Sequence, residues 1–459
     1  MASKQNVTGK DLHRLGYRPA KWWGPAIQEA NRLGLPGSDL AAFLQSAAPK
    51  VRAPLEPGSR PLHVNLRAES LVETTNVDAV VETMQAVLTV PTALRGAVMP
   101  DACPAGPVGT IPVGGVVVTH DAIHPGMHSA DICCSVMMTS LGNADPRRII
   151  DAAQSVTHFG GGGREDRFSL PTRVIREMRG NRYLRDEKSI ALAYGHLGTQ
   201  GDGNHFLYVG TSEHTGETVL VTHHGSRGLG AYLYDQGMRV AETFRRDLAP
   251  QVAKQHAWLP FSEALGQDYW EALQIVRVWT KCSHGVLHDA VATASGASPT
   301  GRFWNEHNFV FRDGDEFYHA KGATPLDDRF VPDSQDGLRL VPLNMAEPIL
   351  VVRGSTTRTN LGFAPHGAGR NASRSAHRRS LGNRAERAIL AEETAGIDVR
   401  FYSGVPDVTE LPSAYKSAAA VQRQMLEYGL GEVVDRIFPY GCIMAGDWKR
   451  HAPWRRKRG

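Results

Sequence analysis

The sequence has 459 residues, of which 41% are hydrophobic and 21% charged, with 47 Gly and 27 Pro. These proportions exclude a disordered, collagen-like or coiled-coil chain. No apolar stretch approaches the ~18 residues that span a bilayer, and the N-terminus lacks the apolar core of a secretory signal. We therefore expect a soluble, cytoplasmic protein without a membrane partner.

The formal net charge of +4 is concentrated in two places. Residues 449–459 contain six Lys or Arg and no acid, and Trp454 lies among them, which suits single-stranded RNA. An arginine cluster begins at Arg370, and the i, i+4 spacing of Arg370, Arg374 and Arg378 predicts one helical face that contacts phosphates. A solvated charged face and a terminus without a role are the alternatives.

In chain order, the first predicted elements are helices, because WWGPAIQEANRLGL and SDLAAFLQSAA carry apolar residues at helical spacing. Short β-rich runs follow from residue 61 to 140, among them LHVNL, AVLTV and IPVGGVVVTH. Residues 268–294 form the longest predicted helix, strand-like pieces follow it, and another helix is predicted to begin near Gly369.

This order predicts an α/β (α+β) fold with a single large domain. We expect a helical N-terminal extension over residues 1–60, the main domain over 61–446 and a basic C-terminal tail over 447–459. The five cysteines are an odd number and form no CxxC motif, which argues against a disulfide framework and against a structural zinc site of the usual spacing. A metal-binding cysteine would therefore act singly, with ligands from distant segments.

Candidate ligands recur in glycine-rich, turn-forming segments, where backbone can approach a ligand closely. The candidate metal ligands are Asp131, Cys134, His205, His223 and His307. One carboxylate, one thiolate and several imidazoles suit Mn, Fe or Zn and disfavour Ca or Mg, and the thiolate could bridge two ions. A single histidine is more often a structural residue than a ligand, so these segments indicate a metal site only when they are taken together.

His366 lies in the segment PHGAGR, at the start of the helix predicted near Gly369. Backbone N–H groups and Arg370 would hold an anion in front of its ring. This environment suits a histidine that attacks phosphorus, and the alternative is a turn that only caps a helix.

At these motifs the sequence resembles the RtcB family of RNA-splicing ligases. The resemblance runs from VMPDACPAG at 98–106 to CIMAG at 442–446, through SADICC, GNHFL, HHGSRGLG, HNF, KGATP and HGAGR in family order. It implies the family fold, in which one α/β domain carries a deep metal-containing cleft. The departures described below favour a divergent bacterial-type paralogue.

The resemblance implies a GTP- and Mn-dependent RNA ligase for RNA repair or tRNA splicing. It would join RNA 3′-phosphate or 2′,3′-cyclic phosphate ends to 5′-hydroxyl ends, with His366 as the guanylylated nucleophile and two Mn²⁺ ions on the five candidate ligands. We expect a monomer, with an archease-like activator as a further partner. The alternatives are a dinuclear metallophosphoesterase that acts on RNA ends without guanylylation, and a non-catalytic RNA- or ribosome-binding paralogue.

The resemblance also assigns binding residues. Those implied in nucleotide binding are Asn204, Asn308, Ser355, His366, Gly367, Ala368, Gly369 and Tyr415. Those implied in RNA or phosphate binding are Asp101, Arg227, Arg370 and Arg374. Tyr208 stands where the family has a guanine-reading glutamate, and Ala445 where it has a lysine, which leaves guanine specificity open. Lys449 could fold back to replace that lysine.

Overall fold

The computed structural model describes residues 6–450 except 18, 20, 21, 36, 107–109 and 333. Its helices are α1 Gly9–Arg14, α2 Trp23–Leu33, α3 Gly37–Ala47, α4 Leu71–Val87, α5 Pro125–His128, α6 Pro146–Val156, α7 Thr172–Gly180, α8 Glu187–Gly195, α9 Arg227–Leu248, α10 Ala264–Ser295, α11 Arg374–Ser380, α12 Glu386–Glu393 and α13 Ala418–Glu427. Its strands are β1 Leu62–Val64, β2 Ala93–Cys103, β3 Val113–His120, β4 Ala122–Ile123, β5 Ser135–Ser140, β6 Phe206–Ser212, β7 Thr218–His224, β8 Leu259–Pro260, β9 Gly301–Glu306, β10 Asn308–Asp313, β11 Glu316–Lys321, β12 Ala323–Pro325, β13 Leu338–Val341, β14 Ile349–Arg353, β15 Phe363–Pro365, β16 Asp398–Phe401 and β17 Glu432–Met444.

Two mixed sheets make up most of the body. One has the strand order β1-β2-β3-β11-β10, and the other has β13-β14-β17-β6-β7-β5-β9 with β16 paired to β17. The chain passes from the second sheet to the first between β9 and β10, where His307 is the only intervening residue. The prediction of one large mixed α/β domain is confirmed, and the sheets bring distant segments of the chain to this junction.

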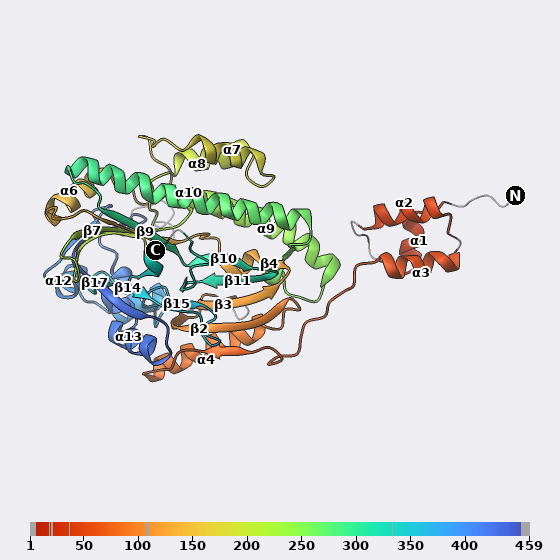
Figure 1. Ribbon diagram of the computed structural model, residues 1–459. Helices are drawn as coiled ribbons and strands as arrows, with labels where there is room; N and C mark the ends of the chain where they lie inside the picture. Colours follow the sequence, from red (N-terminus) through yellow and green to blue (C-terminus); the bar gives the residue numbers. More distant parts are fainter. Residues whose placement is uncertain are drawn as a thin grey trace.

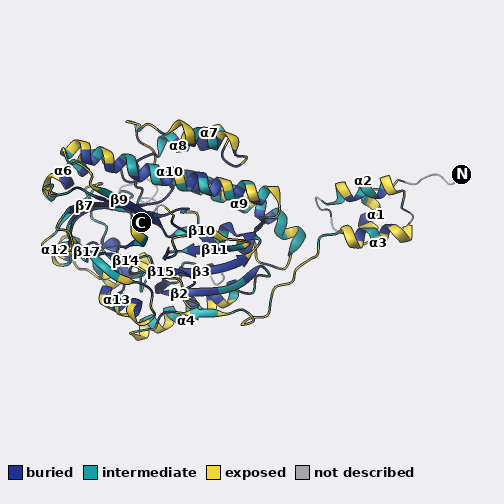
Figure 2. Ribbon diagram, in the orientation of Figure 1, coloured by how far each residue is buried: buried dark blue, intermediate teal, exposed yellow. Residues whose placement is uncertain are grey.

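Helices α9 and α10 run above the strands and cover them (Figure 1). The strands are largely buried and the outward faces of the helices are exposed (Figure 2). Helix α10 confirms the predicted longest helix, because apolar residues such as Val276, Trp279 and Leu287 recur at helical spacing and are fully buried. Gly296, with a φ of 70°, ends the helix in the left-handed region that glycine adopts without strain.

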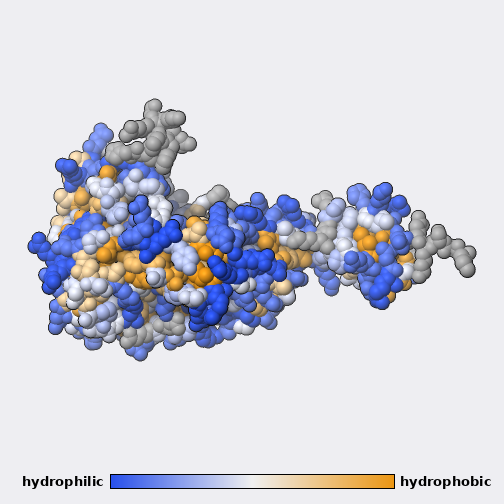
Figure 3. Space-filling view, turned by 90° about the horizontal axis from the view of Figure 1, so that it is seen from above, coloured by the Kyte–Doolittle hydropathy of each residue, from blue (hydrophilic) through white to orange (hydrophobic). Residues whose placement is uncertain are grey.

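The N-terminal helices α1–α3 pack on one another around their own hydrophobic cluster, which includes Leu12, Ala30 and Leu44. They lie beside the body and are joined to it by an extended segment (Figures 1 and 3). The predicted helical character of this region is confirmed. The boundaries proposed for the extension, the main domain and the tail stay predictions.

Two predicted elements are wrong. The run AVLTV at 86–90 is not a strand, because Ser70 caps α4 by accepting a hydrogen bond from the backbone N–H of Glu73, and this helix continues to Val87. The helix predicted near Gly369 begins at Arg374 instead, where Ser373 caps it by accepting from the N–H of Ala376.

Among the described residues, no helix combines the length and the apolar character that a membrane crossing needs.

Buried histidines give the fold a testable acid sensitivity, and His319 on β11 is the clearest case. Its Nε2 accepts a hydrogen bond of 2.9 Å from the backbone N–H of His124, and burial lowers the pKa of His319 from 6.5 to about 3. The unfolded chain therefore takes up a proton below pH 6.5 that the folded chain refuses. Each such group should lower the free energy of unfolding by about 1.4 kcal/mol per pH unit as the pH falls from 6.5 towards 3.

His319→Gln keeps a hydrogen-bond acceptor but removes this titration. We expect its free energy of unfolding to depend less steeply on pH between 6 and 4, by about 1.4 kcal/mol per unit. Urea unfolding across this range, with a chelator present, measures the slope. His214→Gln, at an exposed position, should keep the wild-type slope, and an unchanged slope in His319→Gln would contradict the prediction.

Candidate functional site

The five candidate metal ligands meet where neighbouring strands of the larger sheet begin or end. In antiparallel pairing, the start of β5 lies opposite the ends of β7 and β9, and the start of β6 lies opposite the end of β7. Asp131 and Cys134 precede β5, His205 precedes β6, His223 lies near the end of β7, and His307 follows β9. The pairing therefore brings together residues that are up to 176 positions apart, from 131 to 307.

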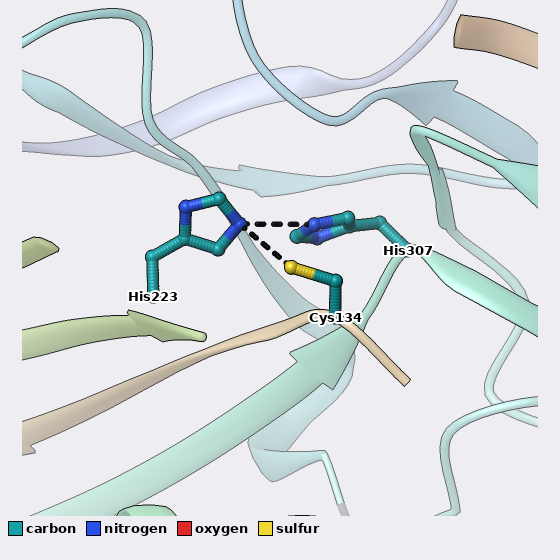
Figure 4. Close-up of side chains that lie close together, drawn as sticks. All are labelled: Cys134, His223 and His307. Atoms are coloured by element: carbon teal, nitrogen blue, oxygen red, sulfur yellow. Dashed lines mark hydrogen bonds between the residues drawn. The ribbon is translucent and has the colours of Figure 1, made fainter. Parts of the chain in front are cut away.

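Two groups of ligand atoms share one sulfur. Cys134, His223 and His307 form one group, and Asp131, Cys134 and His205 form the other, with the atoms of each group within 4.8 Å of one another. His223 Nε2 lies 3.1 Å from Cys134 Sγ and 3.1 Å from His307 Nε2 (Figure 4). His205 Nε2 lies 3.5 Å from both Cys134 Sγ and Asp131 Oδ2. Cys134 is thus the common member.

Backbone carbonyls orient two of the rings. His205 Nδ1 lies 2.5 Å from the carbonyl oxygen of Gln200, and His223 Nδ1 lies 3.1 Å from that of Asn204. Each Nδ1 therefore donates its proton outward, and the lone pair of Nε2 points into the cluster, as in histidines that bind metals.

The charge states fit a cation. Burial would raise the pKa of Asp131, but the nearby His205 imidazole, whose Nε2 lies 3.5 Å from Oδ2, lowers it to about 2 in the protein alone, so this group is a carboxylate. Burial lowers the pKa of His223 to about 3, which keeps its ring neutral. Burial raises the pKa of the Cys134 thiol in the protein alone, and a bound cation reverses that shift. The donor set of sulfur, nitrogen and oxygen atoms suits a borderline divalent ion, and the shared sulfur suits two ions.

Cys133 lies apart from this cluster. Its φ of 58° turns the chain between Ile132 and Cys134, and its backbone N–H donates to the carbonyl oxygen of Asn308. Its buried thiol is hydrogen-bonded to Thr280 of α10. The two adjacent cysteines therefore face different surroundings.

His366 follows β15 and lies beside the cluster. Its Nδ1 is 2.6 Å from Asp101 Oδ2, and its ring centroid is 4.8 Å from that of His307. Asp101 was expected near an RNA terminus, but its side chain is fully buried against the ring and backbone of His366. Because helix α11 begins only at Arg374, His366 lies on a turn and not at a helix start.

Glycines let the backbone approach the His366 turn closely. Gly369 has a φ of 70°, and a Cβ there would collide with the carbonyl oxygen of Asp101. A Cβ at Gly322 would lie 3.0 Å from Cε1 of His366. The segments HGAGR and KGATP therefore need glycine for packing around this one histidine.

A cavity extends from the cluster past His366. Of the predicted nucleotide-binding residues, those that line it are Asn204, His366, Gly367, Ala368, Gly369 and Tyr415. Arg370 also lines it, whereas Asn308 and Ser355 do not. The Asn308 side-chain oxygen accepts from the N–H of Gly322, and Ser355 is exposed on a loop. The nucleotide contact expected of Ser355 has no support in this geometry.

Another wall of the same cavity was missed from the sequence. It consists of Phe206, Tyr208, Pro342, Leu343, Asn344, Met345, Ile349, Cys442 and Met444. Most of these are apolar residues in or beside strands, which is the pattern of an ordinary core. Only the strand order β14-β17-β6 shows that they share one surface.

The prediction that Arg370 and Arg374 share one helical face is wrong. Arg370 precedes α11, so it does not share a helical face with Arg374. Instead, Arg370 Nη2 and Arg374 Nε both donate to the buried carboxylate of Glu410, and the hydroxyl of Tyr415 donates to it at 2.6 Å. The guanidinium of Arg370 also lies 4.5 Å from the Tyr415 ring centroid. Glu410 thus gathers these cations at the cavity.

Arg227 begins α9, with a φ of 56°. Its Nη2 donates to the carbonyl oxygen of Gly160 at 2.9 Å, and its Nε donates to Thr199 Oγ1 at 3.2 Å. Burial lowers the pKa of this guanidinium. A phosphate contact by Arg227 stays a prediction.

The described start of the tail packs on the body. Lys449 Nζ and Trp448 Nε1 each lie 3.0 Å from Asp202 Oδ2, and Arg450 pairs with Glu386 at 2.6 Å. Lys449 does not line the cavity, so the idea that it replaces the missing lysine in the nucleotide pocket is not supported. The rest of the predicted RNA-binding tail, residues 451–459, lies outside the described residues.

Comparison with known proteins shows similarity over about half of the chain or more. Residues 172–445 match the family model for tRNA-splicing ligase RtcB. The tRNA-splicing ligase RtcB of Thermococcus kodakarensis is 28% identical over 285 residues, which cover 53% of this chain and 58% of that protein. The RNA-splicing ligase RtcB of Mycobacterium tuberculosis is 27% identical over 293 residues, which cover 56% of this chain and 66% of that protein.

The tRNA-splicing ligase RtcB of Pyrococcus abyssi is 26% identical over 290 residues, which cover 53% of this chain and 31% of that protein. The chain thus spans between about a third and two thirds of the length of these curated relatives.

Proposed function

The chain belongs to the RtcB family, and from this premise we propose that it is a GTP- and Mn-dependent RNA ligase. The observation that carries the proposal is the position of His366, whose ring lies 4.8 Å from that of the candidate metal ligand His307 and lines the same cavity as His223. A histidine nucleophile and a two-group donor cluster are the parts that phosphoryl transfer through a covalent intermediate needs.

Asp131, Cys134, His205, His223 and His307 would hold two Mn²⁺ ions, which when bound act as Lewis acids on phosphoryl oxygens. Asp101 accepts the Nδ1 proton of His366, so the lone pair of the ring lies on Nε2. Nε2 attacks the α-phosphorus of GTP, the new P–N bond replaces the α–β P–O bond, and pyrophosphate leaves.

The RNA 3′-phosphate then attacks the guanylylated His366, and the P–N bond breaks to give an RNA-ppG end. A 2′,3′-cyclic phosphate is first opened by water to a 3′-phosphate. The 5′-hydroxyl of the second RNA end attacks the activated 3′-phosphate, forms the phosphodiester and releases GMP. Arg227, Arg370 and Arg374 would contact phosphates along this path. The cytoplasmic setting, the monomer and the archease-like activator remain part of the proposal.

A ligation assay tests the proposal. The protein, Mn²⁺ and GTP are incubated with one RNA that ends in a 2′,3′-cyclic phosphate and another that begins with a 5′-hydroxyl. We expect a joined product that requires GTP and disappears when a chelator is added. Opened or dephosphorylated ends without joining, at a rate independent of GTP, would indicate the metallophosphoesterase instead. RNA binding without any chemistry would indicate a non-catalytic paralogue.

Asp101 should act through His366 and not on substrate. Asp101→Asn replaces a carboxylate that holds the Nδ1 proton with an amide that can hold the wrong tautomer. We expect guanylylation to slow by about 10²- to 10⁴-fold. The metal content, measured by elemental analysis, should stay at the wild-type value because Asp101 belongs to neither ligand group.

Asp315→Asn is the matched control, since this carboxylate is exposed in the turn between β10 and β11. It should leave the rate of guanylylation unchanged. A wild-type rate in Asp101→Asn, or a loss of metal with the activity, would contradict the positioning role.

A further inference from the structure

One wall of the cavity beside His366 is a hydrophobic face of the larger sheet. Neighbouring strands supply it: β6 gives Phe206 and Tyr208, β17 gives Cys442 and Met444, and β14 gives Ile349. Residues two apart on a strand point to the same side, so each of the first two pairs lies on one face. A flat apolar wall of this kind suits the face of a planar ring.

The hydroxyl of Tyr208, the one hydroxyl among the described residues of this wall, already makes a hydrogen bond within the protein. The Tyr208 side chain is 2% exposed, and its hydroxyl donates to the carbonyl oxygen of Ile437 at 2.8 Å. The backbone N–H of Ile349 also donates to the same hydroxyl oxygen, so Tyr208 presents mainly its ring to the cavity.

Among the described residues that line the cavity, Glu410 is the one acidic side chain, and its carboxylate is also occupied. The Glu410 carboxylate is 2% exposed and accepts from Arg370, Arg374 and the hydroxyl of Tyr415. A guanine N–H would have to share this carboxylate with three existing donors, two of them charge-assisted bonds, which are among the strongest in a protein.

The remaining amides do not distinguish one purine from the other. The side-chain oxygen of Asn344 accepts from the N–H groups of Ala346 and Glu347 at 3.0 and 3.1 Å, which leaves only its NH₂ group to donate. Such a donor finds an acceptor on adenine as well as on guanine. The backbone carbonyl oxygen of Asn204 lies 3.1 Å from Nδ1 of the metal-ligand candidate His223, so we assign Asn204 to the end of the cavity that would hold the phosphates.

Selective reading of guanine needs acceptors that face its N1–H and 2-amino groups. Pockets that hydrogen-bond a substrate group reject the analogue without it by about 10⁴- to 10⁵-fold, whereas apolar pockets discriminate by only about 10- to 200-fold between ligands of different size. GTP and ATP carry purines of nearly equal size, so the apolar wall gives little basis for choosing between them.

We propose that this pocket takes purine nucleoside triphosphates through their ring face and phosphates, so that ATP and GTP both modify His366. The inference rests on the proposed function and concerns the co-substrate of that same site. Each reaction forms one P–N bond, breaks one α–β P–O bond and releases pyrophosphate.

The test uses the full-length protein with Mn²⁺ and, in separate reactions, α-labelled GTP and α-labelled ATP. The readout is the rate of acid-labile label incorporation at limiting nucleotide. We expect the ratio of the GTP rate to the ATP rate to lie below about 10, and a ratio above that value overturns the inference. Labelling by GTP alone would leave the proposed ligase intact, whereas labelling by neither nucleotide would refute the ligase itself.

Tyr208→Gln adds a second measurement by placing a free amide oxygen on the wall. We expect the GTP-to-ATP ratio to rise several-fold. Phe438→Gln, an aromatic-to-amide change at a half-exposed position of β17 outside the cavity, should keep the wild-type ratio. An unchanged ratio in a folded, labelled Tyr208→Gln protein would show that the wall does not contact the base and would overturn the inference.

Discussion

His366→Ala is expected to abolish labelling by α-labelled GTP while the protein keeps its metal. The ring of His366 lines the cavity, and its Nδ1 is held by Asp101, so Nε2 is the one atom of this side chain available to attack phosphorus. Removal of a covalent nucleophile lowers rates by about 10⁶-fold in well-studied enzymes, so no label should be detectable. His366 belongs to neither ligand group, so elemental analysis should give the wild-type metal content.

His120→Ala is the control for this experiment, because His120 is exposed at the end of β3 and lies outside the cavity. Its labelling should equal that of the wild type. The label on the wild-type protein should be released by acid and survive alkali, as a phosphoramidate does. Label that persists in His366→Ala would exclude His366 as the nucleophile.

Much of the candidate cluster could be predicted from the sequence. Asp131 and Cys134 stand in a short polar segment before a strand, and His223 lies near the end of another strand, directly before a glycine-rich segment. Such segments place side chains at the ends of strands. The prediction was possible because these residue types and their turn-forming neighbours can be recognised in short stretches of sequence. The long helix α10 could also be predicted from local sequence, because its apolar residues recur at a helical spacing along its 32 residues.

The arginine cluster shows where local pattern fails. The spacing of Arg370 and Arg374 is helical, but the positive φ of Gly369 and the cap at Ser373 move the helix start beyond Arg370. The partner that brings both arginines together is Glu410, which lies 40 positions after Arg370. The local periodicity of a sequence cannot predict an ion pair between residues this far apart in the chain.

The apolar wall of the cavity could not be predicted from the sequence, for a different reason. Tyr208, Ile349 and Met444 have the burial and composition of ordinary strand residues, so their sequence context predicts a core. Their adjacency depends on the crossing order β14-β17-β6, which is a property of the sheet and not of any one strand. Residue types identify the reacting end of a site more readily than the end that selects its ligand.

Cys134→Ala should have the other largest effect, the loss of both metal ions and of guanylylation. Cys134 Sγ belongs to both ligand groups, and it is the only soft donor in either. Its removal leaves two histidines in one group and a carboxylate with one histidine in the other, neither of which completes a three-residue group. Elemental analysis after desalting should fall from about two ions per chain to well below one, and α-labelled GTP should give no label.

Cys133→Ala is the matched control on the neighbouring residue. Its thiol contacts Thr280 in the core, so the substitution should cost about 1–2 kcal/mol of unfolding free energy through lost packing. Both ions and the GTP label should remain. The reverse pattern, with metal lost in Cys133→Ala and kept in Cys134→Ala, would contradict the assignment of the bridging sulfur.

The same geometry predicts a graded result at His205, which belongs to only one of the two groups. His205→Ala should therefore lose one ion and keep the other, which Cys134, His223 and His307 still hold. Guanylylation should fall with the lost ion, because two cations would share the charge that develops on the phosphoryl oxygens. If His205→Ala lost both ions together, the cluster would be a single cooperative site and the two-ion assignment would be wrong.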